Sequence, residues 1–262
     1  MLELNKVYNM DCIEGMKLIP DNSVDLTVTS PPYDNLRTYN WYSWDFERVA
    51  KELYRVTKQW WVVVWVVWDA TIKWSETGTS FKQALFFKQI GFNLHDTMIY
   101  AKENYVPLTH NRYEQQFEYM FILSKRKPKA FNPIMRDNIW KWQKTGWTFR
   151  HDWDTLGKKH TQWVIKDQSF SPNIFWYKVG KYKTSSDIIS FQHPATFPEK
   201  LAEDHIISWS NEWDTVLDPF MWSGTTAKMA IINKRNYIWF ELSKEYCDII
   251  EARLKSVQVW LF

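Results

Sequence analysis

The chain has 262 residues, enough for one large domain with an insert, and 45% of them are hydrophobic, which excludes global disorder. It carries 33 Lys and Arg against 30 Asp and Glu, so its net charge of +3 marks neither a strong polycation nor an acidic tail. No apolar run approaches the roughly 18 residues of a membrane-spanning helix, and the first residues lack the apolar stretch of a secretory signal. Two cysteines, Cys12 and Cys247, are too few for a disulfide framework and suit a reducing compartment. We therefore expect a cytoplasmic protein that does not contact membranes.

Apolar periodicity predicts strands and helices that alternate at both ends of the chain. The predicted strands are 24–29, 62–67, 96–100, 117–123, 215–217 and 237–240, and the predicted helices are 45–56, 80–90, 199–209, 226–232 and 244–257. Gly91 is placed to end the second helix. This alternation predicts an α/β fold with a mostly parallel sheet, whose ligands lie at the carboxyl ends of the strands.

The segment from Lys125 to Lys183 is strongly basic. It holds 14 Lys and Arg against four Asp, a net charge of +10, together with 12 Phe, Trp and Tyr. Its weak periodicity predicts a loop-rich insert. Cations interleaved with aromatic rings favour contact with nucleic acid. The alternative is a solvated basic region with buried aromatic side chains.

A proline corner, Ser30-Pro31-Pro32-Tyr33, follows the first predicted strand. Two prolines fix the backbone and remove two N–H donors. The Ser30 hydroxyl and the Pro31 carbonyl are then free to accept hydrogen bonds from an aromatic amine and to expose its lone pair as a nucleophile. Tyr33 offers a flat face on which a base can stack. An ordinary turn after a strand would also explain the prolines.

A second motif spans 216–226, where a strand, a tight turn of small residues and a helix start follow one another. This is the geometry that binds a nucleotide-like cofactor. Glu241 ends the next predicted strand, where an acid can accept hydrogen bonds from ribose hydroxyls. A solvated acid that caps a helix is the alternative for Glu241. The six histidines lack metal-ligand spacing, so no metal site is predicted.

Together, TSPPY at 29–33, DPFM-SGTT at 218–226 and YI-FE at 237–241 resemble the β-class DNA amino-group methyltransferases, which methylate cytosine at N4 or adenine at N6. The catalytic motif precedes the cofactor motif, as in that family, and the basic insert lies where the family has its target-recognition region. QHPATFP at 192–198 and NMDC at 9–12 resemble two further cofactor segments. The resemblance spans nearly the whole chain.

The resemblance implies a Rossmann-like S-adenosylmethionine-dependent sheet with an inserted target-recognition region. Its parts would be a catalytic half at 1–124, the recognition insert at 125–185 and a cofactor half at 186–262. It implies double-stranded DNA as partner, direct methyl transfer to a flipped base, and it leaves a homodimer open. The implied catalytic residues are Ser30, Pro31, Pro32 and Tyr33. The implied cofactor-binding residues are Asp11, His193, Pro194, Thr196, Phe197, Asp218, Pro219, Phe220, Ser223, Gly224, Thr225 and Glu241.

The chain departs from the family pattern in its tryptophans. It has 18 Trp and 7 Gly, whereas average usage predicts about 18 glycines. The family pattern has glycine at Trp222 and Trp239. Glycine-like contexts also surround Trp41, Trp60, Trp61, Trp68, Trp74, Trp142, Trp163, Trp213 and Trp260. An indole at 222 would project toward the cofactor volume, so we expect impaired cofactor binding. A naturally tryptophan-rich protein is the alternative.

Two other functions stay open at this point. One is a catalytically inactive DNA-binding protein on the same scaffold. The other is an RNA or protein-glutamine methyltransferase, because related proline-proline motifs act on those substrates. The long basic insert favours a nucleic acid over a protein side chain.

Overall fold

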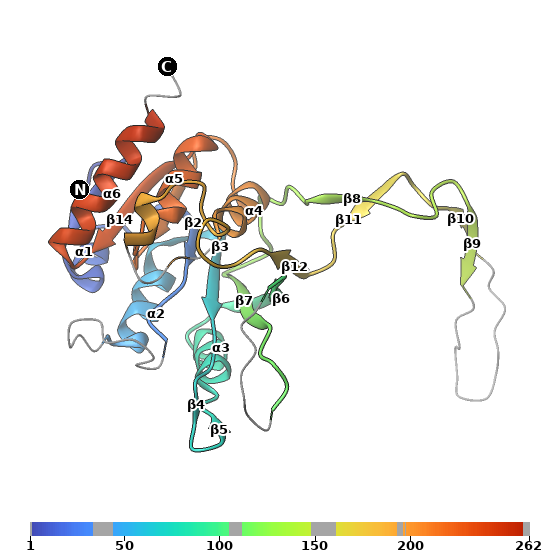
Figure 1. Cartoon of the computed structure of the whole chain (residues 1–262), viewed down its shortest axis with the longest axis horizontal. Coiled ribbons are helices and arrows are strands. Elements are labelled where there is room, and N and C mark those ends of the chain that lie inside the picture. Colours follow the sequence, from blue (N-terminus) through green and yellow to red (C-terminus); the bar gives the residue numbers. More distant parts are fainter. Residues whose placement is uncertain are drawn as a thin grey trace. The chain divides into compact units, whose positions relative to one another are not determined.

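The computed structural model describes residues 2–33, 44–104, 112–147, 161–192, 196 and 198–258 (Figure 1). The chain divides into two compact units. The larger unit joins Met1–Asn132 to Asn173–Phe262, and the smaller is Pro133–Pro172.

One eight-stranded sheet organises the larger unit. Its strands lie in the order β1 (Lys6–Asn9), β14 (Asn236–Glu241), β13 (Thr215–Asp218), β2 (Val24–Thr29), β3 (Thr57–Val67), β7 (Phe117–Ser124), β6 (Asn93–Lys102) and β12 (Ile174–Tyr177). Among these described strands, only β7 runs antiparallel to its neighbours. The predicted α/β fold with a mostly parallel sheet is confirmed, and the architecture is Rossmann-like.

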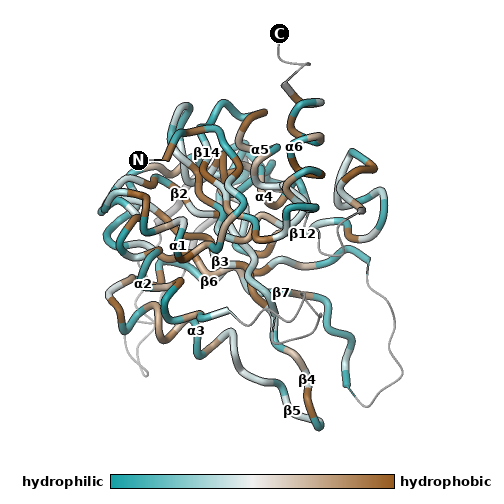
Figure 2. The backbone as a smooth tube through the Cα atoms, turned by 90° about the vertical axis from the view of Figure 1, so that its left-hand side faces the viewer, coloured by the Kyte–Doolittle hydropathy of each residue, from teal (hydrophilic) through white to brown (hydrophobic). Residues whose placement is uncertain are grey.

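Helices cover both faces of this sheet and give it two hydrophobic cores. Helices α1 (Cys12–Lys17), α2 (Phe46–Val56) and α3 (Thr79–Gln89) pack on one face around Trp65 and Phe87. Helices α4 (Glu199–Trp209), α5 (Thr225–Ile232) and α6 (Lys244–Gln258) pack on the other face around Leu26 and Leu201. Both faces of β2 and of the second part of β3 are thereby buried, which accounts for the continuous apolar run from Trp61 to Val67 in β3. Figure 2 shows hydrophobic stretches gathered around β2 and β14, inside the helical layers.

The observed elements differ from the predicted ones at the start of β3 and near the N-terminus, among other places. β3 begins at Thr57, directly after α2, and includes Trp60 and Trp61, where a break between helix and strand was expected. No glycine is needed at this junction, because the Thr57 hydroxyl donates to the Leu53 carbonyl at 2.6 Å while Thr57 already pairs with Val24. The short β1 and α1 were not predicted as elements.

The order of the strands creates a switch point between β2 and β13. From β2 the chain continues to β3 on one side, and from β13 it continues to β14 on the other side. Crossover connections diverge at such a point, and in open α/β sheets the carboxyl ends of the two strands there are where a ligand crevice is expected. Ser30 and Asp218 stand at those ends.

The smaller unit contains two antiparallel two-stranded sheets. One pairs β8 (Met135–Asp137) with β11 (Gln168–Phe170), and the other pairs β9 (Lys144–Trp147) with β10 (Thr161–Val164), which lie between them in the chain. It lies within the predicted insert at 125–185, but β12, which is also within that range, pairs with β6 in the main sheet. The remaining short elements are β4 (Thr71–Ile72), β5 (Ser75–Glu76) and the 3-10 turn η1 (Ile189–Gln192).

Two asparagines of the larger unit flank the smaller one. The Asn132 side chain donates to the carbonyls of Ile207 and Ser210 at 3.0 and 3.1 Å. The Asn173 side chain donates to Asp96 and to the Thr97 carbonyl, both at 3.2 Å. The chain is therefore fixed to the sheet and its helices where it leaves and where it returns.

No helix within the described ranges is long and apolar enough to cross a membrane.

Candidate active site

The proline corner lies at the carboxyl end of β2, as predicted. Ser30 and Pro31 are buried, and Pro32 and Tyr33 are half-buried. The Ser30 Oγ lies 2.6 Å from the Tyr33 hydroxyl, so the two ends of the motif contact each other. The hydroxyl groups of Ser30 and Tyr33 are therefore hydrogen-bonded to each other within the corner.

Glu118 of β7 adds a carboxylate to these hydrogen bonds. The Tyr33 hydroxyl donates to Glu118 Oε2 at 2.9 Å, and Glu118 Oε1 pairs with Lys102 Nζ, also at 2.9 Å. Lys102 is the last residue of β6, and its ammonium lies 5.3 Å from the centroid of the Trp68 ring. Burial and the neighbouring Glu118 raise the pKa of Tyr33, so its hydroxyl keeps its proton at neutral pH.

The corner and the predicted cofactor turn contact each other directly. Thr29 Oγ1 donates to Asp218 Oδ1 at 2.6 Å, and Trp222 Nε1 donates to the Ser30 carbonyl at 2.7 Å. Two motifs separated by about 190 residues in the sequence therefore meet at the switch point.

Asp218 is almost fully buried and serves the turn itself. Its Oδ1 also accepts from the Phe220 backbone N–H at 3.1 Å. Burial raises the pKa of Asp218 to about 7, although the bonds from Thr29 and Phe220 favour its charged form.

The rest of the turn leads into α5. Pro219, Phe220, Ser223 and Thr225 are buried. Gly224 has φ +78°, in the left-handed region, and a Cβ there would lie 3.1 Å from the Ile250 side chain. Only glycine adopts this conformation without strain, so the turn requires glycine at 224.

Glu241 and Asp11 stand at the same edge, at the ends of the adjacent strands β14 and β1. The Glu241 carboxylate accepts from the Ser243 N–H at 2.8 Å, and burial raises its pKa even though the Trp222 and Leu242 N–H groups favour the charged form. Asp11 caps α1, with Oδ1 accepting from the N–H groups of Ile13 and Glu14.

The QHPATFP segment is only partly described. His193, Pro194 and Phe197 lie outside the described residues, and Thr196 is half-buried. The predicted role of this segment therefore stays a prediction.

Four tryptophans at the glycine-like positions have the backbone of glycine. Trp74, Trp142, Trp213 and Trp222 all have positive φ, at 69°, 66°, 71° and 50°. Side chains with a Cβ are strained there, by about 1 kcal/mol or more. This supports the interpretation that tryptophan stands where the fold favours glycine.

Unpaired indole N–H groups also support the interpretation that tryptophan stands where the fold favours glycine. In the described part of the chain, the Nε1 donors of Trp68 and Trp239 are buried without a hydrogen-bond partner. A buried donor left unpaired costs about 1–3 kcal/mol. Trp209, which is not one of the glycine-like positions, shares this feature.

Glu118 and Lys102 were not identified from the sequence. The available signal was the acid at the second position of the otherwise apolar strand 117–123, because a charge in a buried strand needs a partner. No group of three or more His, Cys, Asp and Glu side chains that can hold a metal ion occurs among the residues the structure describes.

Comparisons with known proteins agree with this geometry. The profile of the N6_N4_Mtase family, described as DNA methylase, matches residues 24–252. The orphan methyltransferase M.BamHII of Bacillus amyloliquefaciens is 57% identical over 242 residues, which is 91% of either chain. The type II methyltransferase M.BglII of Bacillus subtilis is 28% identical, over 94% of this chain and 68% of its own.

Solved structures show the same fold. The PvuII cytosine-N4-specific DNA methyltransferase superposes with a TM-score of 0.71 at 20% identity, covering 97% of this chain and 87% of its own. A putative DNA modification methylase of Thermus thermophilus, solved with S-adenosyl-L-methionine, superposes with a TM-score of 0.65 at 21% identity, covering 96% of this chain and 93% of its own.

Proposed function

The chain belongs to the N6_N4_Mtase family of DNA methylases, and on that premise we propose that it moves a methyl group from S-adenosylmethionine to the exocyclic amine of a flipped cytosine (N4) or adenine (N6) in double-stranded DNA. The observation that carries this proposal is the contact between the Ser30 corner and the Asp218 turn. A target amine and a methyl donor must meet, and the two motifs suited to them share one crevice at the switch point.

The hydrogen bonds of the corner orient Ser30 toward an amine. A carboxylate only accepts, so Tyr33 donates its proton to Glu118. The Ser30 hydroxyl then donates to the Tyr33 oxygen, 2.6 Å away. Its lone pairs stay free to accept from an amine N–H, together with the Pro31 carbonyl. Both hydrogen bonds reduce the delocalisation of the nitrogen lone pair into the base, so the amine becomes a better nucleophile.

S-adenosylmethionine, when bound, supplies an electrophilic methyl group on a sulfonium sulfur. Most residues of the crevice fit such a molecule. Within the described chain no side chain caps α5, so the first N–H groups of that helix are available to a ligand. Glu241 would accept from ribose hydroxyls and Asp11 would contact the adenine, while His193, Pro194, Thr196 and Phe197 would line the methionine end.

Trp222 does not fit. Its indole reaches from the cofactor turn to the Ser30 carbonyl, and so it spans the crevice that the methyl group must cross. We propose that this indole weakens cofactor binding and with it the activity of this chain. The same observation favours the second candidate, a DNA-binding protein on this scaffold that has lost catalysis.

DNA contact would come in part from the smaller unit. Trp140 and Phe170 are exposed there, at 63% and 60%, and Arg136 and Lys166 lie in the same unit. Exposed aromatic and basic side chains suit a nucleic-acid surface.

Labelled methyl transfer tests the proposal. The chain and its Trp222→Gly variant are incubated with labelled S-adenosylmethionine and, in separate reactions, with DNA or RNA, and the nucleosides are identified by mass spectrometry. We expect label on cytosine N4 or adenine N6, stronger in the variant and lost in Ser30→Ala. Label on RNA alone would refute the DNA assignment. DNA binding without any methylation in both chains would establish the inactive alternative.

A further inference from the structure

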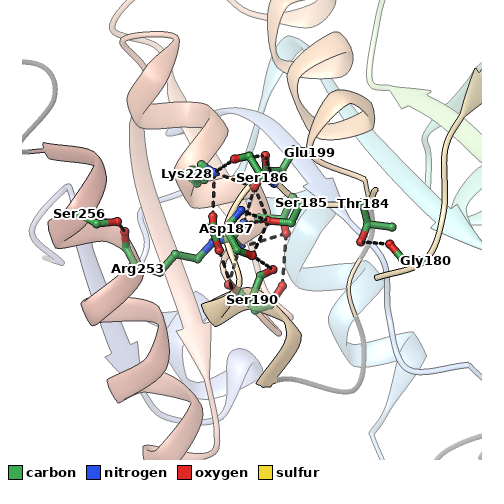
Figure 3. A network of polar contacts seen from close by, with 12 residues as sticks. Gly180, Thr184, Ser185, Ser186, Asp187, Ser190, Glu199, Lys228, Arg253 and Ser256 are labelled. Carbon is green, nitrogen blue, oxygen red and sulfur yellow. Dashed lines mark hydrogen bonds and ion pairs between the residues drawn. The ribbon is translucent and has the colours of Figure 1, made fainter. Parts of the chain in front are cut away.

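A buried network of charges lies behind the cofactor turn, and the chemistry above does not use it. It joins Arg253 of α6, Lys228 of α5, Asp187, and Glu199 at the start of α4 (Figure 3). The side chains of Arg253 and Lys228 are 0% and 9% exposed. Two cations and two carboxylates therefore balance inside the larger unit.

Every donor of the two cations has an acceptor. Arg253 uses all five N–H groups, with one on Asp187 at 3.0 Å and one on Glu199 at 2.6 Å. The others reach Ser185 at 3.0 Å, the Ser223 carbonyl at 2.7 Å and Thr225 Oγ1 at 3.3 Å.

Lys228 completes the set. It uses its three donors on Ser186 at 2.7 Å, Asp187 at 2.7 Å and Glu199 at 2.8 Å. Such complete satisfaction defines one geometry for the elements involved.

Stability alone does not explain this network. A buried ion pair costs desolvation that apolar residues of the same size avoid, so replacing such a group by well-packed apolar residues is often neutral or stabilising. Burial opposes the charged forms of Asp187 and Glu199, but the bonds from Lys228 and Arg253 outweigh it, so the pKa of each carboxyl lies below its ordinary value. Both carboxylates therefore stay charged at neutral pH, and the full cost of burying them is incurred.

The bond from Arg253 to the Ser223 carbonyl acts on the turn itself. In a trans peptide the carbonyl of one residue and the N–H of the next point in opposite directions. Holding the Ser223 carbonyl toward Arg253 therefore fixes the Gly224 N–H toward the Met221 carbonyl, 2.8 Å away. That peptide leads into Thr225, where α5 begins.

We infer that Arg253 is a positioning residue for the cofactor turn: its guanidinium sets the Ser223–Gly224 peptide and aims the first N–H groups of α5 at the bound cofactor. The inference rests on the proposed function for the identity of that ligand. The positioning of the turn by Arg253 does not depend on the proposed function.

Hydrogen exchange of the ligand-free full-length chain tests the positioning role. Arg253→Lys keeps the charge but replaces five donors on three nitrogens by three donors on one nitrogen, so it cannot keep the bonds to Ser223 and Thr225 together with those to Asp187, Ser185 and Glu199. We expect exchange of the peptide spanning 219–226 to rise about ten-fold, while strands β2 and β3 keep their protection. Lys255→Met, an exposed position on the same helix, is the matched control and leaves the turn unchanged.

A second variant keeps the test decisive if Arg253→Lys does not fold. Thr225→Val removes one acceptor of Arg253 and leaves the ion pairs in place, and a smaller rise confined to the turn is expected. Unchanged exchange in the turn, or a rise spread evenly over the chain, would overturn the inference.

Cofactor titration separates this inference from the proposed function. In the Trp222→Gly background, Arg253→Lys is expected to raise the Kd for S-adenosylmethionine about ten-fold and to leave the KM for DNA unchanged. If the Trp222→Gly parent binds no S-adenosylmethionine at all, the proposed function fails, and the exchange data still decide whether Arg253 holds the turn.

Discussion

The two halves of the crevice are held in different ways. At the corner, Lys102 and Glu118 support a side-chain hydroxyl through Tyr33 and remain 18% and 12% exposed. At the turn, Arg253 is fully buried and holds a backbone carbonyl. The difference follows the chemistry expected of each half, because an amine acceptor requires a correctly oriented hydroxyl, whereas a cofactor cradle requires correctly oriented backbone N–H groups.

Removing the indole that spans the two halves is expected to have the largest effect. Trp222→Gly frees the crevice and relieves a positive φ, so affinity for S-adenosylmethionine should rise about 100-fold, or ~2.7 kcal/mol. Isothermal titration measures this change. Trp213→Gly, which also replaces a tryptophan at positive φ but at an exposed site, is the control and should not change affinity. Micromolar binding by the unchanged chain would contradict the prediction.

Asp218 links the halves through Thr29, and its titration should be visible in stability. Because folding raises its pKa to about 7, the folded state holds the proton more firmly. Its contribution to stability is then full below about pH 4 and is lost as the pH rises to 7, an effect on the order of a few kcal/mol.

Asp218→Asn cannot titrate and should remove that part of the pH dependence. Urea unfolding of both chains between pH 4 and pH 8 compares the slopes. Parallel curves would show that Asp218 does not titrate in this window.

Breaking the corner support should affect catalysis more than cofactor binding. Glu118→Gln can donate to Tyr33 and thereby reverse the hydrogen bonds that free Ser30 to accept. In the Trp222→Gly background we expect kcat to fall about ten-fold with the Kd for S-adenosylmethionine unchanged, as measured by steady-state kinetics and titration. Glu212→Gln, which alters an exposed ion pair, serves as control. An equal loss in both variants would refute the role of Glu118.

The smallest effect is expected far from both halves. Trp213 is 70% exposed at φ 71°, so Trp213→Gly should raise the free energy of unfolding by about 1 kcal/mol through relief of backbone strain alone. Chemical denaturation measures it. A loss of stability would show that the indole makes contacts that outweigh the strain.

Local sequence signals predicted the fold well where burial and periodicity coincide. The valine run at 62–67 is covered on both faces and could only be a buried strand. Gly91, at φ +115°, ends α3 where its sequence predicted a stop. β1 was missed because Lys6–Asn9 is a short edge strand with exposed ends, so it lacks the alternation that marks a strand.

The site was predictable only within each motif. Ser30 and Glu241 could be placed at strand ends from their neighbours, but no spacing in the sequence brings Glu118 to Tyr33. Arg253 is marked in the sequence by its position on the helix. It lies between Ile250 and Val257 on the apolar stripe of α6, where a cation must find buried partners.

The anchoring of Asn132 and Asn173 has a consequence for target recognition. Both residues are hydrogen-bonded to the larger unit, so the forty residues between them can be exchanged without loss of any strand of the eight-stranded sheet. If the smaller unit contacts the DNA target, as we propose, exchanging these forty residues would change the target while every strand of the sheet that carries Ser30 and Asp218 is kept.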